Sequence, residues 1–169
     1  MNAFVSKTIL KWLLVCVLLV IFGCGNQEQN DTASYKQGVD AYTAGNYSAA
    51  LEKLRPLAEK GNVGAQFNLG LMYQQGQGVE QNNAEAGNWF LKAAEQGHVE
   101  AQQNLGLRFA KGLGVERDWV QADKWFTIAA ASGKETAVNN KKVIEVHMPP
   151  EKISEANTLA QEWLAKHKK

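Results

Sequence analysis

The stretch that decides the fold is "AQFNLGLMYQQGQGV", from Ala65 to Val79, because a near copy of it, "AQQNLGLRFAKGLGV", runs from Ala101 to Val115. The second copy begins 36 residues after the first. Self-similarity at a fixed period of this size is typical of repeat proteins, in which stacked units bury a continuous core. The glycines at the end of each copy leave two alternatives open, a phosphate-binding loop or a turn that is built twice.

The same register extends beyond the quoted stretch. Small, aromatic and turn-forming residues recur at it, so the chain is predicted to contain one structural unit at least twice. The equivalent pairs are Leu69/Leu105, Gly70/Gly106, Gly76/Gly112, Gly78/Gly114, Trp89/Trp125, Phe90/Phe126, Ala94/Ala130 and Gly97/Gly133.

Each unit has two stretches of helical periodicity. Ala65, Leu69 and Tyr73 fall on one helix face, and Ala86 and Phe90 fall on a face of a second helix. Glycine-rich segments separate the two stretches and follow the second. Each unit is therefore predicted to be a helix-turn-helix pair.

Gly70 and Gly106 lie inside the predicted first helices, where glycine costs about 0.5–1 kcal/mol relative to alanine. A cost repeated in the same register indicates that a large side chain of the paired helix packs against the glycine. The candidate partners are the aromatic residues Trp89, Phe90, Trp125 and Phe126.

The glycines between the helices favour a turn over a phosphate site. A phosphate-binding glycine loop follows a strand and places its ligand at a helix N-terminus, whereas "QQGQGVEQ" follows a helical pattern. We expect these glycines to adopt positive φ, with a valine of each turn packed beneath. The glycines are Gly76, Gly78, Gly112 and Gly114, and the valines are Val79 and Val115.

The register also continues toward both ends of the chain. Gly38 precedes Ala50 by four residues fewer than Gly70 precedes Ala86, so an earlier unit with a shorter turn is predicted. On the C-terminal side Ala137 keeps the register. There the leucine, glycine and aromatic residue of the repeat are replaced by Lys141, Lys142 and Glu145, as expected of a polar face turned to water. The amphipathic stretch that begins at Pro150 is predicted to be a helix that seals the stack.

These motifs resemble two related families. Gly38, Gly45, Asn46, Tyr47 and Ala50 resemble a tetratricopeptide repeat, and "AQFNLGLMYQQGQGVEQNNAEAGNWFLKAAEQGHVEAQ" resembles the Sel-1-like repeat, which has a longer turn. The resemblance covers roughly residues 35–165. It implies an all-α fold, an α/α superhelix (solenoid) of antiparallel helix pairs with a C-terminal capping helix. The expected units are a tetratricopeptide-like repeat at 34–61, Sel-1-like repeats at 62–97 and 98–133, and a degenerate repeat with the capping helix at 134–169.

The N-terminal segment predicts export and lipid attachment. Lys7 and Lys11 precede a short apolar run that ends at Phe22, and Gly23-Cys24 then resembles the lipobox of bacterial lipoproteins. Residues 1–23 are thus expected to be a signal peptide, residues 24–33 a polar linker, and Cys24 the site of lipid attachment; an uncleaved short anchor is the alternative. By resemblance to a bacterial sorting rule, the residue after Cys24 favours the outer membrane, with the protein facing the periplasm.

Composition and spacing argue against several other functions. The chain of 169 residues has a net charge of +1, and removing Lys7 and Lys11 leaves no basic excess for nucleic-acid binding. After cleavage Cys24 is the only cysteine left, so no disulfide or cysteine metal site is expected. His98 and His147 lack a helical metal-ligating partner, and no spacing assigns a nucleophile or an acid-base pair. No enzyme activity, metal or cofactor is therefore expected.

The resemblance implies that the concave face, lined by the first helices, binds a peptide or protein segment. We expect a non-enzymatic adaptor or scaffold of the bacterial cell envelope, although the apolar members of the candidate set could instead pack between units. The alternative is binding of cell-wall glycan (peptidoglycan), or assistance to an envelope enzyme, through Trp119 and the glutamine-rich turns, since the position equivalent to Trp119 is the polar Asn83. The candidate partner-binding residues are Phe67, Leu71, Gln74, Gln103, Leu107 and Lys111.

Overall fold

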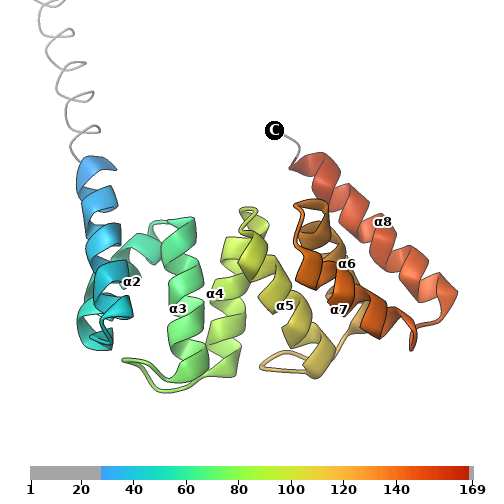
Figure 1. The fold of residues 1–169 in the computed structure, drawn as a ribbon, viewed down its shortest axis with the longest axis horizontal. Coiled ribbons are helices and arrows are strands. Elements are labelled where there is room, and N and C mark those ends of the chain that lie inside the picture. The colour runs from blue at the N-terminus through green and yellow to red at the C-terminus, as the bar shows by residue number, and fades with distance from the viewer. Residues whose placement is uncertain (1–27, 168–169) are drawn as a thin grey trace, which may run out of the picture.

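The computed structural model describes residues 28–167, and within them it contains helices and turns but no strand. An N-terminal helix occupies residues 28–43. The helices that follow are α2 (Tyr47–Glu59), α3 (Val63–Gln75), α4 (Asn83–Glu95), α5 (Val99–Lys111), α6 (Trp119–Ala131), α7 (Glu135–Glu145) and α8 (Pro150–Lys166) (Figure 1).

Helices that follow one another in sequence pack side by side from α2 to α7, which gives an elongated stack (Figure 1). The tightest pairs are α3 with α4 and α5 with α6, the two copies of the repeat. The predicted α/α superhelix of helix pairs is therefore confirmed.

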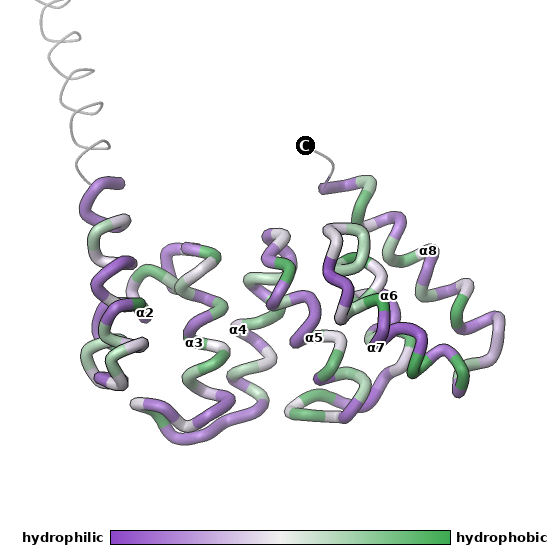
Figure 2. Tube along the Cα trace, viewed as in Figure 1, coloured by the Kyte–Doolittle hydropathy of each residue, from purple (hydrophilic) through white to green (hydrophobic). Residues whose placement is uncertain are grey.

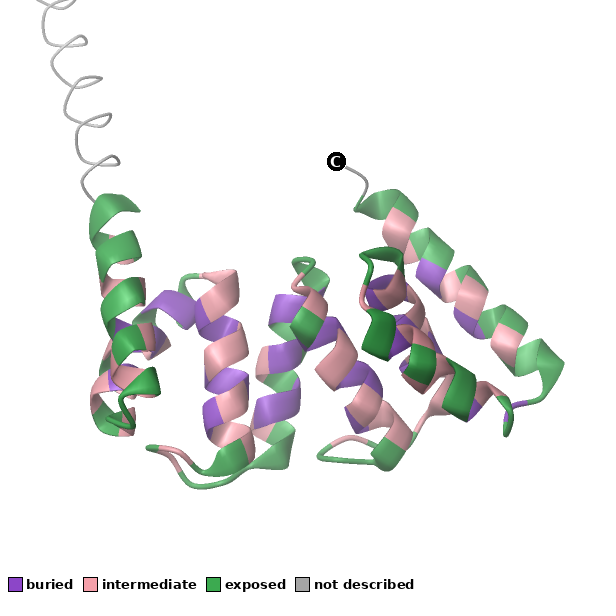
Figure 3. Ribbon diagram, in the orientation of Figure 1, coloured by how far each residue is buried: buried purple, intermediate pink, exposed green. Residues whose placement is uncertain are grey.

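The core is distributed along the stack rather than gathered in one place. Buried alanine, leucine and phenylalanine positions recur in each pair (Figure 3), and hydrophobic residues alternate with polar ones along every helix (Figure 2). Leu69 and Phe90 are fully buried in one pair, and Leu105 and Phe126 are almost fully buried in the next. Because each unit buries its apolar face against its neighbours, hydrophobic contacts hold the stack together along its length.

The two helix-interior glycines allow a close approach of paired helices. A Cβ atom built on Gly70 would lie 2.6 Å from Cε1 of Phe90, and one built on Gly106 would lie 2.6 Å from Phe126. The partners are thus the two phenylalanines and not the neighbouring tryptophans. Trp125 instead faces Trp163 of α8 with ring centroids 6.0 Å apart.

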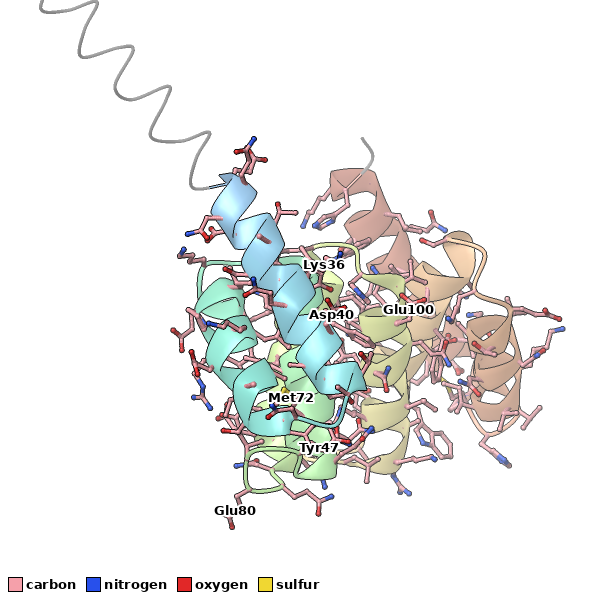
Figure 4. The ribbon with its side chains drawn as sticks, turned by 60° about the vertical axis from the view of Figure 1, so that its left-hand side comes forward. Lys36, Asp40, Tyr47, Met72, Glu80 and Glu100 are labelled. Carbon is pink, nitrogen blue, oxygen red and sulfur yellow. The ribbon has the colours of Figure 1, made fainter. Side chains whose placement is uncertain are left out.

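The turn glycines have the expected left-handed conformation, with φ of +68° at Gly76 and +71° at Gly78. They also allow each turn to pack closely against the preceding unit. A Cβ on Gly78 would lie 2.8 Å from the carbonyl oxygen of Tyr47 at the start of α2, beside the turn that carries Glu80 (Figure 4). The equivalent Gly114 approaches the backbone of Asn83 at the start of α4. Each long turn therefore packs against the N-terminal end of the preceding unit's second helix.

Part of the polar linker expected over 24–33 is a helix instead. Residues 28–33 are helical, and the carboxylate of Asp31 accepts a hydrogen bond from Nζ of Lys60 at 3.0 Å, which ties the helix to the end of α2. A polar composition alone does not prevent a helix when a neighbouring unit supports it. The signal peptide predicted at 1–23 and the lipid-attachment residue Cys24 lie outside the described residues. Within those residues, no helix has both the length and the apolar content needed to cross a membrane.

The C-terminal end differs from expectation at Lys141, which turns inward rather than to water. Its Nζ lies 2.8 Å from Oδ1 of Asp123, a fully buried residue of α6, and 3.0 Å from Oε1 of Glu145. Nζ also donates to Oδ1 of Asn157 on α8 at 3.1 Å. Burial raises the pKa of Asp123, and the hydrogen bond from Lys141 opposes that shift. The residue that breaks the repeat pattern therefore joins the last three helices.

The capping helix α8 packs mainly against α6 and leaves the outer face of α7 open. Val143 of α7 and Val146, which follows the last residue of that helix, are 65% and 77% exposed. Val143 is equivalent to Leu71 and Leu107, which the following units partly cover. The predicted seal thus lies over the side of the last repeat rather than over its end.

We expect Gly70→Ala to destabilise the fold by about 1–3 kcal/mol, because the new methyl group overlaps the ring of Phe90. The matched control is Gly87→Ala in α4, where the added Cβ would make an ordinary 3.6 Å contact with Val115 and should gain up to about 1 kcal/mol of helix propensity. Urea unfolding of both variants measures the difference. Equal unfolding midpoints for the two variants would show that contact with Phe90 is not the reason why residue 70 is a glycine.

We expect Lys141→Met to destabilise the fold by roughly 3–5 kcal/mol at neutral pH, because it leaves the carboxylate of Asp123 buried without its partner. A carboxyl whose pKa is higher in the folded than in the unfolded chain reduces stability as the pH rises through that pKa. The deficit of Lys141→Met should therefore shrink in acid and grow toward neutral pH. Thermal unfolding across this range, with the exposed Lys142→Met as control, tests it; a deficit independent of pH would contradict the role given to Asp123.

Candidate functional site

The six candidate partner-binding residues lie on two equivalent helices, and five of them are half-buried. Lys111, at the end of α5, is exposed. The residues are Phe67, Leu71 and Gln74 on α3, and Gln103, Leu107 and Lys111 on α5.

The apolar candidates contribute to packing between units. Phe67 and Leu71 pack against the core cluster of the two repeats, and Leu107 packs against the cluster that includes α7. The ring of Phe67 lies 5.7 Å from that of Phe90 and stacks on His98, with centroids 4.4 Å apart and an interplanar angle of 21°. These side chains thus have one buried edge and one accessible edge.

Two polar candidates are already hydrogen-bonded to neighbouring units. Oε1 of Gln74 accepts from Nη2 of Arg108 at 2.9 Å, and Oε1 of Gln103 accepts from the hydroxyl of Thr136 at 2.7 Å. These bonds orient both side chains and leave each amide NH2 group as a donor for a partner.

Arg108 is a residue that the repeat comparison did not single out. It is only 2% exposed, and its Nη1 donates to the carbonyls of Asn83 at 2.9 Å and Leu113 at 2.8 Å. Burial lowers the pKa of its guanidinium. The equivalent position in the preceding unit is Met72, and this change from methionine to arginine is the sequence signal that could have found it.

His98 caps α5 beside the apolar candidates. Its Nδ1 accepts from the backbone N–H of Ala101 at 3.3 Å, which satisfies one of the free amides at the start of α5. Burial lowers the pKa of His98, and the carboxylate of Glu100 opposes that shift. Glu100, near the start of α5 (Figure 4), also pairs with Lys134 at 3.2 Å, which links the second repeat to α7.

Trp119 lies at the edge of a cavity of about 560 Å³ formed by the turn before α6 and the start of α8. Its ring is half-buried, and the guanidinium of Arg117 lies 5.7 Å from the ring centroid. Phe109 and Met148 also line this cavity, and its charged lining residues are two cations and two carboxylates: Arg117, Lys152, Glu116 and Asp118. In the part of the chain that the structure describes, no cluster of histidine, cysteine or acidic residues could hold a metal ion.

The family model described as Sel1 repeat matches residues 63–98 and 99–134, which are the α3–α4 and α5–α6 pairs. Two solved structures are similar along the stack. A protective antigen of uropathogenic Escherichia coli strains, which displays an SLR fold, is 34% identical with a TM-score of 0.77 over 84% of this chain and 31% of that one. A Sel1 repeat protein from Oxalobacter formigenes is 33% identical with a TM-score of 0.64 over 76% of this chain and 55% of that one.

Two curated proteins match a shorter stretch. The exopolysaccharide production negative regulator of Rhizobium meliloti (strain 1021) is 40% identical over 60 residues, which is 36% of this chain and 22% of that protein. The regulator of the same name from Rhizobium leguminosarum bv. viciae is 37% identical over 71 residues, 42% of this chain and 27% of that protein. The chain thus spans less than a third of the curated relatives that it matches. The chain therefore contains two Sel1 repeats, and it shares its solenoid fold with Sel1-repeat proteins of known structure.

Proposed function

We propose that this chain is a non-enzymatic adaptor of the bacterial cell envelope. It binds a peptide or protein segment on the inner face of its helical stack, which is the surface lined by α3 and α5. The Sel1-repeat solenoid is a fold typical of protein-interaction scaffolds. Stacked repeats form an extended surface along which one segment can contact several units.

The observation that carries the proposal is the arrangement on α3 and α5. Phe67, Leu71 and Leu107 each pack one edge into the core, and Gln103 and Lys111 add polar groups on the same helix as Leu107. Apolar edges bind side chains of a partner, and oriented amides bind its backbone. Such a surface suits recognition of an extended segment better than it suits chemistry on a small substrate.

The N-terminal sequence supports the envelope part of the proposal. Attachment of lipid at Cys24 would hold the stack at a membrane, and the outer membrane with the stack in the periplasm is the location that we propose. The relatives named as negative regulators of exopolysaccharide production are consistent with action through binding to another protein.

A Gln103→Ala, Lys111→Glu double variant should lose its partner without losing its fold, because one side chain is exposed and the other is half-buried. We expect about a tenfold loss of crosslinked partner in intact cell envelopes, since two interface residues at about 1 kcal/mol each suffice for that change. The measurement is crosslinking followed by identification of the proteins bound, with equal helicity of the variants as a requirement.

The matched control is Lys142→Glu on α7. This exposed residue is equivalent to Gly70 and Gly106, so it lies on the side of the helix that is turned away from the inner face. It should crosslink as the wild type does. If the double variant and the control recover the same proteins in the same amounts, the inner face is not the binding surface.

The cavity beside Trp119 favours a second candidate function, binding of cell-wall glycan. Aromatic rings provide flat apolar surfaces for ligand packing, and Arg117 and Lys152 add hydrogen-bond donors at the same cavity. The half-buried ring leaves less area for a sugar than a fully exposed one.

If glycan is the ligand, Trp119→Ala should reduce co-sedimentation with isolated peptidoglycan at least about tenfold, whereas Trp119→Phe should retain most of it. Loss of binding in the alanine variant alone would favour glycan binding over the adaptor function. Equal sedimentation of the wild type and both variants would remove Trp119 from any glycan site.

A further inference from the structure

Gln66 and Gln102 are equivalent glutamines at the start of α3 and α5, and both are buried, with exposures of 4% and 1%. Each donates its Nε2 to a carbonyl oxygen at the end of the preceding second helix. The acceptors are Ala58 at 3.1 Å and Ala94 at 3.2 Å, which are themselves equivalent. The two side chains therefore have the same orientation, and their Oε1 atoms occupy corresponding places.

The groups that meet these two Oε1 atoms differ. Oε1 of Gln66 accepts from the amide of Gln96 at 2.8 Å, and the same amide nitrogen donates to the carbonyl of Gly61 at 3.2 Å. The residue equivalent to Gln96 in the next unit is Ser132, whose side chain is too short to reach as far. Among residues 28–167, no group donates to Oε1 of Gln102, although the atom is buried.

The backbone does not account for this difference. Gln96 and Ser132 follow the last residue of α4 and α6, with φ and ψ of −90° and 6° in one case and −90° and 12° in the other. The chain therefore directs both side chains along equivalent paths. A buried carbonyl without a donor is unfavourable, so a group that supplies the missing hydrogen bond gains affinity from it.

A cavity of about 510 Å³ lies at this place. Gly97, Gln102 and Ser132 line it from the repeats, and Trp163 and His167 line it from α8. The rings of Trp163 and His167 stack with centroids 3.9 Å apart, and the indole N–H of Trp163 donates to Glu95 at 2.8 Å. These contacts hold an aromatic wall beside two polar acceptors, Oε1 of Gln102 and the carbonyl of Gly97.

We propose that this cavity binds the primary carboxamide of a glutamine side chain presented by a partner polypeptide. The two acceptors are carbonyl oxygens, so they bind N–H donors and reject a carboxylate, and burial of the site disfavours a charged donor relative to a neutral NH2 group. The amide of Gln96 shows that a glutamine side chain fits the same pair of acceptors one unit earlier. The aromatic wall packs against the methylene groups of the ligand.

Binding requires a small rearrangement at the rim. Oε1 of Gln102 is buried, and the exposed side chain of Ser132 is the one that turns aside to admit the amide. None of the six candidate residues of the inner face lines this cavity. The carboxamide site is therefore separate from the surface of the proposed function, and the two can fail independently.

Ser132→Gln tests the site from within the chain, because it restores the residue that the preceding unit has. We expect its amide to occupy the cavity and to raise Tm by about 2–4 °C relative to the matched control Ser132→Ala. A Tm equal to or below that of Ser132→Ala would overturn the proposal, since it would show that the two acceptors do not take up a carboxamide.

The ligand arm uses three peptides on the full folded chain: acetyl-Gly-Gln-Gly-N-methylamide and its Met and Glu counterparts, which lack the neutral NH2 group. NMR titration follows the side-chain amide of Gln102 and the indole N–H of Trp163. We expect saturable shifts with the Gln peptide, at least about tenfold weaker binding of the other two, and no binding of the Gln peptide to Ser132→Gln. Equal shifts from all three peptides, or none from the Gln peptide because the cavity holds only water, would overturn the proposal.

Discussion

The rest of the structure depends on the contact between a glycine without a side chain and a phenylalanine ring. Gly70 admits Phe90 and Gly106 admits Phe126 at a distance where a methyl group would overlap the ring. This contact sets how closely the two helices of a unit approach, and the spacing determines where the next first helix can pack. Because it recurs every 36 residues, each unit adds the same step to the stack.

The second structural constraint lies between units, at the long turns. Gly78 and Gly114 bring their turns against the start of the preceding second helix, where a side chain would collide with the backbone of Tyr47 or Asn83. Polar side chains then adapt each junction: Arg108 bonds to Gln74, and Gln96 bonds to Gly61. The repeated glycines thus hold the geometry constant, and the residues that vary in the same register distinguish one junction from the next.

The proposed binding surfaces combine positions that recur in the register, such as Leu71 and Leu107, with positions that vary, such as Phe67 and its equivalent Gln103. Phe67, Leu71 and Leu107 divide their surface between core and solvent, so the same residues stabilise the stack and present an apolar face. At the other end of the repeat, replacement of glutamine by serine at residue 132 changes a closed junction into one beside a cavity. A solenoid of nearly identical units can in this way carry different binding surfaces along its length.

The sequence by itself determined the helix pairs, their 36-residue period, the turn positions and the role of Gly70 and Gly106, because these depend on local periodicity and on residues that recur in one register. Six candidate binding residues could be named, but only the tertiary structure decided which are half-buried and which are already hydrogen-bonded. It also decided that Lys141 turns inward to Asp123 and that α8 folds over α6 instead of the open end of α7. These outcomes depend on contacts between residues distant in the chain, where burial of a charge or of an apolar face is settled by what packs against it and not by its neighbours in sequence.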